Sequence, residues 1–439
     1  MAYLPNIIFA IILIYAILFF SKNIRSIVRN INRGKPIDRS DQPAKRWGNV
    51  FRIALGQSKM VDRPISGILH IIVYVGFVVI NIELIEIVLD GLLGTHRLFA
   101  PYMGSMYNVL IATFEVFAAL VLISVVIFWL RRNAIKIKRF WKPELKGWPK
   151  KDADYILYFE LILMTLFLSM NATDALLQQR NEPHYIQAGL FPVSQFLAPV
   201  FSSLSVATLV ILERTFWWLH ITGILIFLNY LYYSKHLHIL LAFPNTYFQN
   251  LNPLGSFRNN KTVTQEVKLM MDPSADPYAA PAGNVADKFG ASDVTDLNRI
   301  QLLNAYTCTE CGRCTDVCPA NQTGKTLSPR KIMMDTRDRL EEVGKNTPKN
   351  EPFKPDGKQL LNDYISSEEL WACTSCNACV EACPIGIDPL SIIMDMRQYL
   401  VMEQSAAPSD LNNMMSNIEN NGAPWPFSNQ DRMLWTNDN

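Results

Sequence analysis

The first 307 residues of this 439-residue chain contain no cysteine, and all eight cysteines lie between Cys308 and Cys383. The sequence also lacks a Rossmann glycine fingerprint and a P-loop, so no dinucleotide or ATP site is predicted. Its 41 Lys and Arg nearly balance 39 Asp and Glu, which argues against a nucleic-acid partner. Charged residues are only 18% of the chain and apolar residues 49%, which excludes intrinsic disorder and argues against a purely soluble enzyme. We therefore expect an apolar part without cysteine and a separate cysteine-rich part.

Five apolar stretches are candidates for membrane spans, each of which needs about 20 residues. They are residues 6–20, 65–89, 107–130, 155–177 and a fifth that begins near Thr215 and continues as helix until Pro244 stops it. The first has no basic n-region and no small-residue cleavage site, so we interpret it as a retained helix rather than a signal peptide. A further apolar run at residues 200–212 is interpreted as an interfacial helix, and the alternative is a short sixth span.

Basic residues are distributed unequally between the loops that join these spans. The loops 21–67 and 131–154 hold 20 Lys and Arg together, whereas the loops 91–106 and 178–214 hold three. Basic loops remain in the cytoplasm, so the N-terminus is predicted outside. An odd number of spans then puts everything after the fifth helix in the cytoplasm.

Histidines occur at informative places in the predicted spans, where ionisable side chains are usually functional. His70 lies near the start of the second span. His220 and His238 are 18 residues apart, which is five helical turns and about 27 Å, so both are expected on one face of the fifth helix at opposite membrane leaflets. Imidazole is a common axial ligand of haem. His70 lies at the membrane depth of His238, so these two are the natural pair, and His236 is expected to face elsewhere.

The sequence around these histidines resembles the five-helix cytochrome b subunits of the respiratory nitrate reductase gamma type and the membrane subunits of heterodisulfide reductases. The resemblance rests on Gly-Ile-Leu-His-Ile at residues 67–71, Trp-Leu-His-Ile-Thr-Gly at 218–223 and the segment 233–239. In that family the second helix carries two histidines ten residues apart, but this chain has Ile80 at the second position. The resemblance implies one haem b held by His70 and His238, and it leaves His220, a ligand of a possible second haem, without its partner.

The cysteines form two runs of identical spacing, Cys-x2-Cys-x2-Cys-x3-Cys-Pro. In such runs three thiolates bind one [4Fe–4S] cluster and the fourth binds the other cluster. One cluster is therefore predicted on Cys308, Cys311, Cys314 and Cys383, and the other on Cys373, Cys376, Cys379 and Cys318. Disulfides are implausible in the cytoplasm, and zinc sites rarely use this spacing.

The two runs belong to an internal repeat, because residues 329–337 and 389–397 are similar and each starts as a helix at a proline. The 54 residues between Cys318 and Cys373 include helical-looking segments at 332–343 and 360–371. This part resembles the helical dicluster domain of heterodisulfide reductase C-type subunits and of succinate dehydrogenase iron–sulfur proteins.

We therefore predict an all-α membrane domain with a cytochrome b-like bundle, followed by an α-helical dicluster ferredoxin domain. The expected divisions are a transmembrane domain at 1–245, an extended linker at 246–296, a dicluster domain at 297–405 and a C-terminal docking tail at 406–439. The tail holds exposed-looking aromatics, including Trp425, Phe427 and Trp435, and packing on its own domain is an equal alternative.

The predicted function is electron transfer in a bacterial inner membrane, between membrane quinone, a b-type haem and the two clusters. Because the eight cysteines are all assigned, no catalytic residue is predicted, and a separate cysteine-rich iron–sulfur catalytic subunit is expected as partner. The alternatives are a haem-free iron–sulfur anchor and an ion-translocating protein driven by the clusters. Five carboxylates of the spans are candidates for proton or quinone work, but each lies near a predicted helix end or could face solvent, so for any one alone the structural interpretation is preferred: Glu83, Glu86, Glu115, Glu160 and Asp174.

Overall fold

The fold is seen in a computed structural model, which describes residues 3–257, 259–274, 288–349 and 351–437. In these residues the regular elements are all helical. Five helices are long and apolar enough to cross a membrane. The prediction of an all-α protein with five spans is therefore confirmed.

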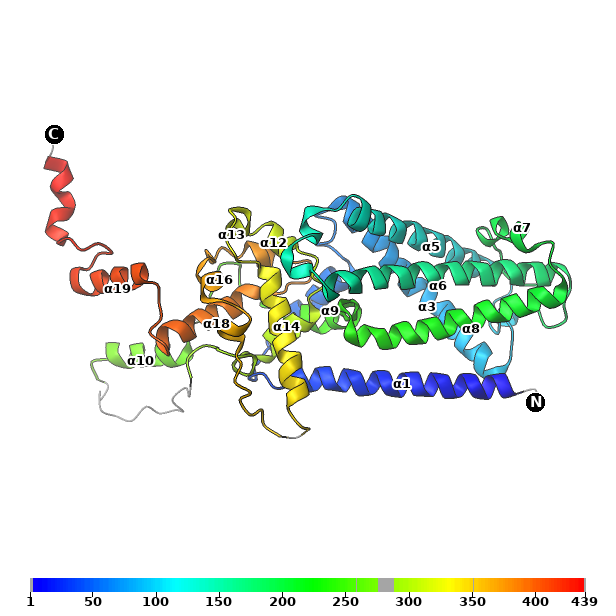
Figure 1. Cartoon of the computed structure of the whole chain (residues 1–439), viewed down its shortest axis with the longest axis horizontal. Helices are drawn as coiled ribbons and strands as arrows, with labels where there is room; N and C mark the ends of the chain where they lie inside the picture. Colours follow the sequence, from blue (N-terminus) through cyan, green and yellow to red (C-terminus); the bar gives the residue numbers. More distant parts are fainter. Residues whose placement is uncertain (1–2, 258, 275–287, 350, 438–439) are drawn as a thin grey trace.

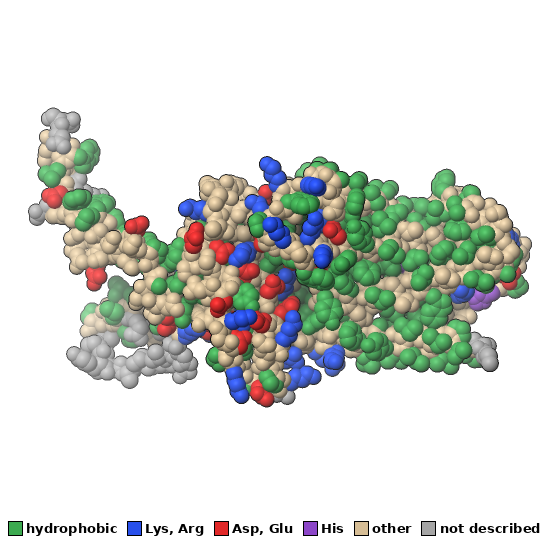
Figure 2. Space-filling model, in the orientation of Figure 1, with side chains coloured by type: hydrophobic (Ala, Val, Ile, Leu, Met, Phe, Trp, Pro, Cys, Tyr) green, Lys and Arg blue, Asp and Glu red, His purple; other side chains and the backbone are tan. Residues whose placement is uncertain are grey.

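The five long helices form one bundle (Figure 1). They are α1 (Leu4–Ile31), α3 (Pro64–Leu93), α5 (Ser105–Trp129), α6 (Trp148–Gln179) and α8 (Val206–Tyr230). Helix α6 packs on α8 and α5, α3 packs on α5, and α1 packs on α3 and α8. Many large apolar side chains on the outside of the bundle are exposed, such as Tyr15 and Leu18 of α1, as expected of a surface that contacts lipid. Figure 2 shows this apolar surface and the charged side chains gathered at one end of it.

Short elements connect the bundle helices. They are α2 (Pro43–Asn49), η1 (Val50–Leu55), α4 (Ala100–Met103), η2 (Leu130–Ala134), η3 (Lys138–Phe140), η4 (Pro143–Leu145), η5 (Ser194–Phe196) and α7 (Ala198–Phe201). The interpretation of residues 200–212 as an interfacial helix was wrong. Residues 206–212 are the first two turns of α8, which starts where the Ser205 hydroxyl accepts a hydrogen bond from the Thr208 amide.

The fifth span does not continue as one helix to Pro244. After α8 the chain forms two 3-10 turns, η6 (Leu231–Tyr233) and η7 (Lys235–Leu237), and then a new helix, α9 (His238–Tyr247). Ser234 interrupts the helix with extended backbone, and Pro244 lies inside α9 rather than at its end. His220 and His238 therefore lie on different helices, and the single-face geometry expected from their spacing does not apply.

The cysteine-rich part is a second helical unit at one end of the bundle (Figure 1). Its longest helices, α14 (Pro329–Asn346) and α18 (Pro389–Met402), each begin with proline at the first position, as the repeat predicts. Asn362 has φ of 72°, so the expected helix at 360–371 is two short pieces. The other elements are η8 (Val294–Asp296), α11 (Arg299–Thr307), α12 (Arg313–Asp316), α13 (Pro319–Gln322), α15 (Leu360–Asp363), α16 (Ser367–Trp371) and α17 (Ala378–Glu381).

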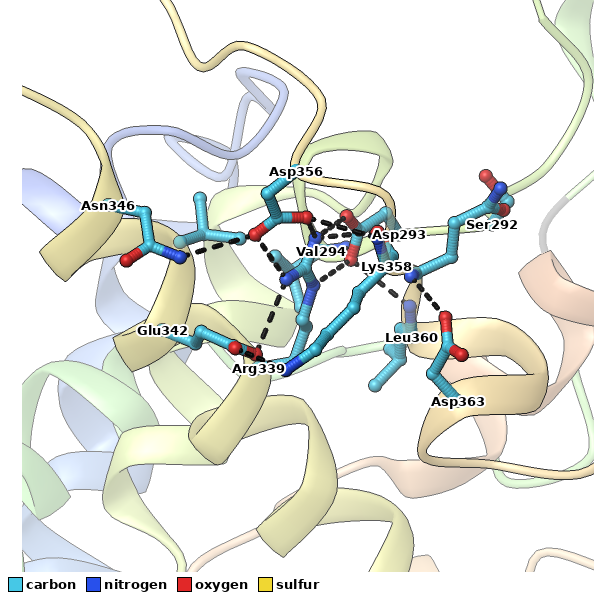
Figure 3. Close-up of polar contacts among 12 residues, drawn as sticks. Ser292, Asp293, Val294, Arg339, Glu342, Asn346, Asp356, Lys358, Leu360 and Asp363 are labelled. Atoms are coloured by element: carbon cyan, nitrogen blue, oxygen red, sulfur yellow. Dashed lines mark hydrogen bonds and ion pairs between the residues drawn. The ribbon is translucent and has the colours of Figure 1, made fainter.

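A buried arginine joins three segments of this unit (Figure 3). The Arg339 side chain has no exposed surface, and it donates to Asp293, to Asp356 at 2.8 Å and to the carbonyl oxygen of Lys358 at 2.7 Å. Asp293 also accepts from the Leu360 amide at 3.2 Å. Arg339 therefore fixes the chain entering the unit, and the loop before α15, onto α14.

The predicted linker is not uniformly extended. Residues 275–287 lie outside the described part, but α10 (Lys261–Met271) is a helix. Ala291 and Val294 are buried in the core, because this segment packs under α14. The tail contains α19 (Ser409–Asn421) and η9 (Asn429–Asn437), and its Phe427 and Trp435 are exposed.

Candidate functional site

The first cysteine-lined cavity lies between α12, α17 and the C-terminal end of α11. It is lined by Cys308, Cys311, Cys314 and Cys383, together with Cys379 and apolar side chains that include Met333 and Ile385. The four cysteines assigned to one cluster are therefore brought together from two runs that are far apart in sequence. The fourth cysteine of the second run, Cys383, turns toward the first run, as the spacing predicts.

The second cysteine-lined cavity holds the other predicted set. Cys318, Cys373, Cys376 and Cys379 line it, with Leu327, Leu390 and Ile393. Cys379 borders both cavities, so the two sites are neighbours. None of the eight cysteines, all of which are described, is in a disulfide.

The loops turn around these cavities through left-handed residues at matching places in the repeat. Glu310 and Gly312 have φ of 56° and 73°, and Ser375 and Asn377 have φ of 57° and 61°. A Cβ atom at Gly312 would lie 2.4 Å from Nη1 of Arg330, so the end of the Arg330 side chain would have to move if another residue replaced this glycine. Backbone amides donate to two of the sulfurs: the amide of Ser375, in the second turn, to Sγ of Cys373 at 3.4 Å, and the amide of Ile387, after the last cysteine, to Sγ of Cys383 at 3.3 Å.

The cavities suit thiolates only when a positive metal group is present. Burial raises the pKa of the Cys308 thiol to about 12 and that of Cys383 to about 11. A metal centre supplies the charge that stabilises the thiolate form. Among the described residues no three His, Cys, Asp or Glu side chains are grouped to hold a single metal ion; the sulfurs are instead spread around each cavity. This donor set fits an iron–sulfur cluster, in which each iron takes one thiolate.

Three histidines gather where the bundle meets the cysteine-rich unit. The ring centroids of His70 and His238 are 6.4 Å apart, and those of His236 and His238 are 5.3 Å apart. The expectation that His236 faces elsewhere was wrong, because residues 235–237 form a 3-10 turn instead of continuing α8. Burial lowers the pKa of His236 to about 3 and also lowers the pKa of His238.

The hydrogen bonds of His70 and His238 fit metal ligation. Nδ1 of His238 donates to the carbonyl oxygen of Lys235 at 3.1 Å, which leaves Nε2 free, the arrangement common among metal-bound histidines. The buried Nδ1 of His70 has no hydrogen-bond partner. The rings of His70 and His238 are near enough to each other that both could serve as ligands if a haem were bound here.

His220 is separated from this group. It is buried in α8, and its Nδ1 donates to the carbonyl oxygen of Leu163 at 3.0 Å. His220 and Ile80 line the same cavity inside the bundle. Among the described residues no second histidine lines this cavity. His96 instead lies beside Asp174, at 3.1 Å.

Both basic loops of the bundle contact the segments that form the first cysteine site. Nζ of Lys59 donates to the carbonyl oxygen of Cys383 at 3.3 Å, and Arg313 donates to the carbonyl oxygen of Lys59 at 2.9 Å. Arg330 forms an ion pair with Glu144 at 2.7 Å. Both loops that contain the excess of basic residues therefore lie at the end of the bundle that carries the cysteine-rich unit.

Glu310 links the cysteine site directly to the histidine group, and the sequence pattern did not single it out. It accepts from Lys235 and forms an ion pair with Arg337 at 2.9 Å. Burial opposes its ionisation, but these two cations outweigh burial and hold the pKa of Glu310 below its ordinary value. The internal repeat is the sequence signal that could have identified Glu310, because the matching position of the second run is the uncharged Ser375.

Most carboxylates of the spans have structural partners, as expected. Glu86 accepts from Tyr107, Glu115 from the amides of Val193 and Ser194, and Asp174 pairs with Arg97. Glu83 differs, because its buried Oε2 has no partner. Glu160 lines the same cavity as His220 and Glu83.

Comparisons with known proteins agree with this site. Residues 307–387 match the family model of the 4Fe-4S dicluster domain. The chain is 27% identical to the "Probable iron-sulfur-binding oxidoreductase FadF" of Bacillus subtilis, over 98% of this chain and 60% of that protein. It is 27% identical to the "EtfAB:quinone oxidoreductase" of Syntrophomonas wolfei, over 91% of this chain and 55% of that protein.

A third relative matches only the cysteine-rich part. It is one of the subunits of a ferredoxin/F420H2-dependent CoB-CoM heterodisulfide reductase of Methanosarcina acetivorans, 31% identical over 27% of this chain and 60% of that protein. No solved structure matches the chain. The chain spans 55–60% of the length of the first two relatives. Residues 307–387 are thus a 4Fe-4S dicluster domain, carried by a chain with membrane-capable helices that is similar to iron–sulfur oxidoreductases.

Proposed function

We propose that this protein carries electrons between membrane quinone and a partner iron–sulfur protein, through a b-type haem and two [4Fe–4S] clusters. The observation that carries the proposal is the juxtaposition of the His70–His238 pair with the cavity of Cys308, Cys311, Cys314 and Cys383. These groups are joined by the Lys235–Glu310 ion pair, and Lys235 also supplies the carbonyl oxygen that orients His238. The names of two relatives, an iron–sulfur-binding oxidoreductase and a quinone oxidoreductase, support the same class of reaction.

The residues have distinct roles in this proposal. His70 and His238 hold the haem, and Cys308, Cys311, Cys314 and Cys383 hold one cluster, whereas Cys373, Cys376, Cys379 and Cys318 hold the other. Haem and clusters accept and release single electrons when bound. The protein's contribution is to keep the sites close, exclude water with apolar walls and place Glu310, Lys235 and Arg337 around the junction.

The proposed location is a bacterial inner membrane with the cysteine-rich unit in the cytoplasm. It is supported by the 20 basic residues in the loops at that end of the bundle, against three in the loops at the other end. The proposed partner is a separate heterodisulfide reductase-like subunit, supported by the relative that is a subunit of such an enzyme. The exposed Phe427 and Trp435 of the tail suit docking of that partner.

The haem assignment is tested by a reduced-minus-oxidised absorption spectrum of the purified protein. Wild type should show a b-type α-band, and His70→Leu and His238→Leu should each abolish it while the iron–sulfur absorbance remains. His236→Leu is the discriminating variant, since it should keep the band. Absence of the band from wild type would refute the haem, and its loss in His236→Leu but not His238→Leu would give the ligand role to His236.

A further inference from the structure

Two cavities follow one another inside the bundle, beyond the histidine group. The central cavity lies among α3, α5, α6 and α8 and has a volume of about 90 Å³. The distal cavity lies nearer the end of the bundle away from the cysteine-rich unit, and its walls include His96, Arg97, Asp174 and Trp217. Glu83 lines both cavities.

The central cavity is apolar except for a few polar groups. One is His220, whose Nδ1 is occupied by the carbonyl oxygen of Leu163; its Nε2 has no hydrogen bond to the protein in the described structure. The wall contributed by α3 holds Ile80, so no second imidazole from that helix can share a metal with His220. Because Nδ1 donates to Leu163, Nε2 is left as an acceptor and is suited to a hydrogen bond from a ligand hydroxyl.

Glu83 stands at the boundary between the two cavities with an unsatisfied oxygen. It is 3% exposed, and its Oε2 has no hydrogen-bond partner. The neighbouring carboxylates of the distal cavity are satisfied, since Glu86 accepts from Tyr107 and Asp174 pairs with Arg97. A buried, unpaired carboxyl group is costly unless it has a functional role. Glu83 is therefore placed to exchange a proton between the two cavities.

The other end of the central cavity approaches the proposed haem ligands. Phe227 lines the cavity, and its ring centroid is 5.4 Å from that of His236, which in turn contacts His238. Phe77, also a lining residue, is 43% exposed on the bundle surface, so the cavity reaches the side that faces lipid. Electrons can enter at one end, protons at the other, and a lipid-soluble substrate from the side.

We propose that the central cavity binds the quinone headgroup, with Nε2 of His220 accepting a hydrogen bond from a ring hydroxyl of the quinol form and Glu83 carrying protons to and from the distal cavity. This inference rests on the proposed function and assigns its substrate site. Reduction of one quinone consumes two electrons and two protons and forms two O–H bonds. The clusters supply the electrons one at a time through the histidine group, Glu83 delivers the protons, and oxidation of quinol is the same path reversed.

The role of Glu83 is tested with Glu83→Gln, which keeps the shape of the side chain but cannot exchange a proton. The dithionite-reduced protein is mixed with decylubiquinone, and reoxidation of the iron–sulfur absorbance is followed. Glu83→Gln should slow reoxidation about 100-fold, the usual effect of losing a proton-transfer group. Glu182→Gln is the control, because Glu182 lines neither cavity, and it should react at the wild-type rate. Reoxidation of Glu83→Gln at the wild-type rate overturns the proton role.

The binding site is tested separately with heptyl-hydroxyquinoline N-oxide, a fluorescent quinol analogue whose quenching reports binding whether or not a haem is present. His220→Leu and Ile80→Phe alter opposite walls of the cavity, and each should weaken binding about tenfold or more while the iron–sulfur absorbance stays intact. Binding at the wild-type affinity in both variants places the analogue elsewhere and overturns the site. Loss of the haem α-band in His220→Leu would show that His220 is a haem ligand, and this result would also overturn the proposed quinone site. A wild-type protein that binds the analogue without any α-band refutes the haem and leaves the quinone site standing.

Discussion

Single residues distinguish the two halves of the cysteine repeat. In each run the residue two positions after the first cysteine has a left-handed backbone conformation. This residue is Glu310 in the first run and Ser375 in the second. Glu310 pairs with Lys235 of the bundle, whereas Ser375 accepts a hydrogen bond from Arg397 of its own unit at 3.2 Å. The site built on Cys308 is therefore the one that faces the membrane part. The repeat can be read from the sequence, but the partner of Glu310 cannot, because Lys235 is 75 residues away and reaches it only through the tertiary fold.

Glu310→Gln removes a negative charge beside the first cluster site and leaves Lys235 and Arg337 in place. The extra positive field should favour the reduced cluster, and we expect its midpoint potential to rise by on the order of 50 mV. A redox titration followed by EPR measures this shift. Glu381→Gln, at an exposed position between Cys379 and Cys383, is the matched control, and its shift should be much smaller because water screens the charge. Equal shifts in both variants would show that the Glu310 ion pairs do not tune the cluster.

Among the elements, the spans and the two proline-started helices were predictable because their signals are local. Hydrophobic length defines α3, α5 and α6, and proline at the first helical position defines α14 and α18. The end of α8 was not predictable in the same way. The break at Ser234 forms where the chain must pass from the bundle into the cysteine-rich unit, and its backbone is held by contacts such as the Lys235 amide to Asp152 at 3.2 Å. This break brings His236 beside His238 and replaces the helical geometry expected from their spacing.

Arg339 is the contact by which α14 organises the cysteine-rich unit (Figure 3). Arg339→Leu leaves Asp293 and Asp356 without their cation, so we expect a loss of about 3–5 kcal/mol, typical of a broken buried ion pair. The measurement is the urea concentration at which the iron–sulfur absorbance is lost. Lys345→Leu, on the same helix but 75% exposed with only a 3.8 Å pair to Glu341, should change stability by about 0.5 kcal/mol or less. If Arg339→Leu lost its iron–sulfur absorbance at the same urea concentration as Lys345→Leu, the proposed role of the Arg339 contact would be refuted.

The same contact makes the unit sensitive to acid. The hydrogen bond from Arg339 holds the pKa of Asp356 below its ordinary value of 3.8. A carboxyl group with a lowered pKa contributes stability above its ordinary pKa and loses it as the pH falls toward the folded-state value. The difference in urea resistance between wild type and Arg339→Leu should therefore be largest above pH 3.8 and should shrink below it. A difference independent of pH over that range would show that Asp356 is not the partner that matters.

The bundle and the cysteine-rich unit follow one another along the long axis of the molecule, with α9 at the junction between them (Figure 1). Charged side chains concentrate where the bundle meets the cysteine-rich unit (Figure 2), and the contacts of Lys59 and Glu144 bring both basic loops to this end. Composition alone indicated two unlike parts, and the loop charges indicated that the cysteines lie at the basic end. Composition could not indicate the cavities inside the bundle, because they depend on which faces of α3, α6 and α8 meet. His220 and Glu83 acquire a proposed role only once those faces are known.

The central claim is that the clusters exchange electrons with quinone through the group held by His70 and His238. The most direct test mixes dithionite-reduced protein in vesicles with decylubiquinone and follows cluster reoxidation by freeze-quench EPR, in wild type and in His238→Leu. The account predicts fast reoxidation in wild type and reoxidation slowed about 100-fold or more in His238→Leu, with both clusters still reduced by dithionite. Reoxidation at equal rates in the two proteins would contradict it.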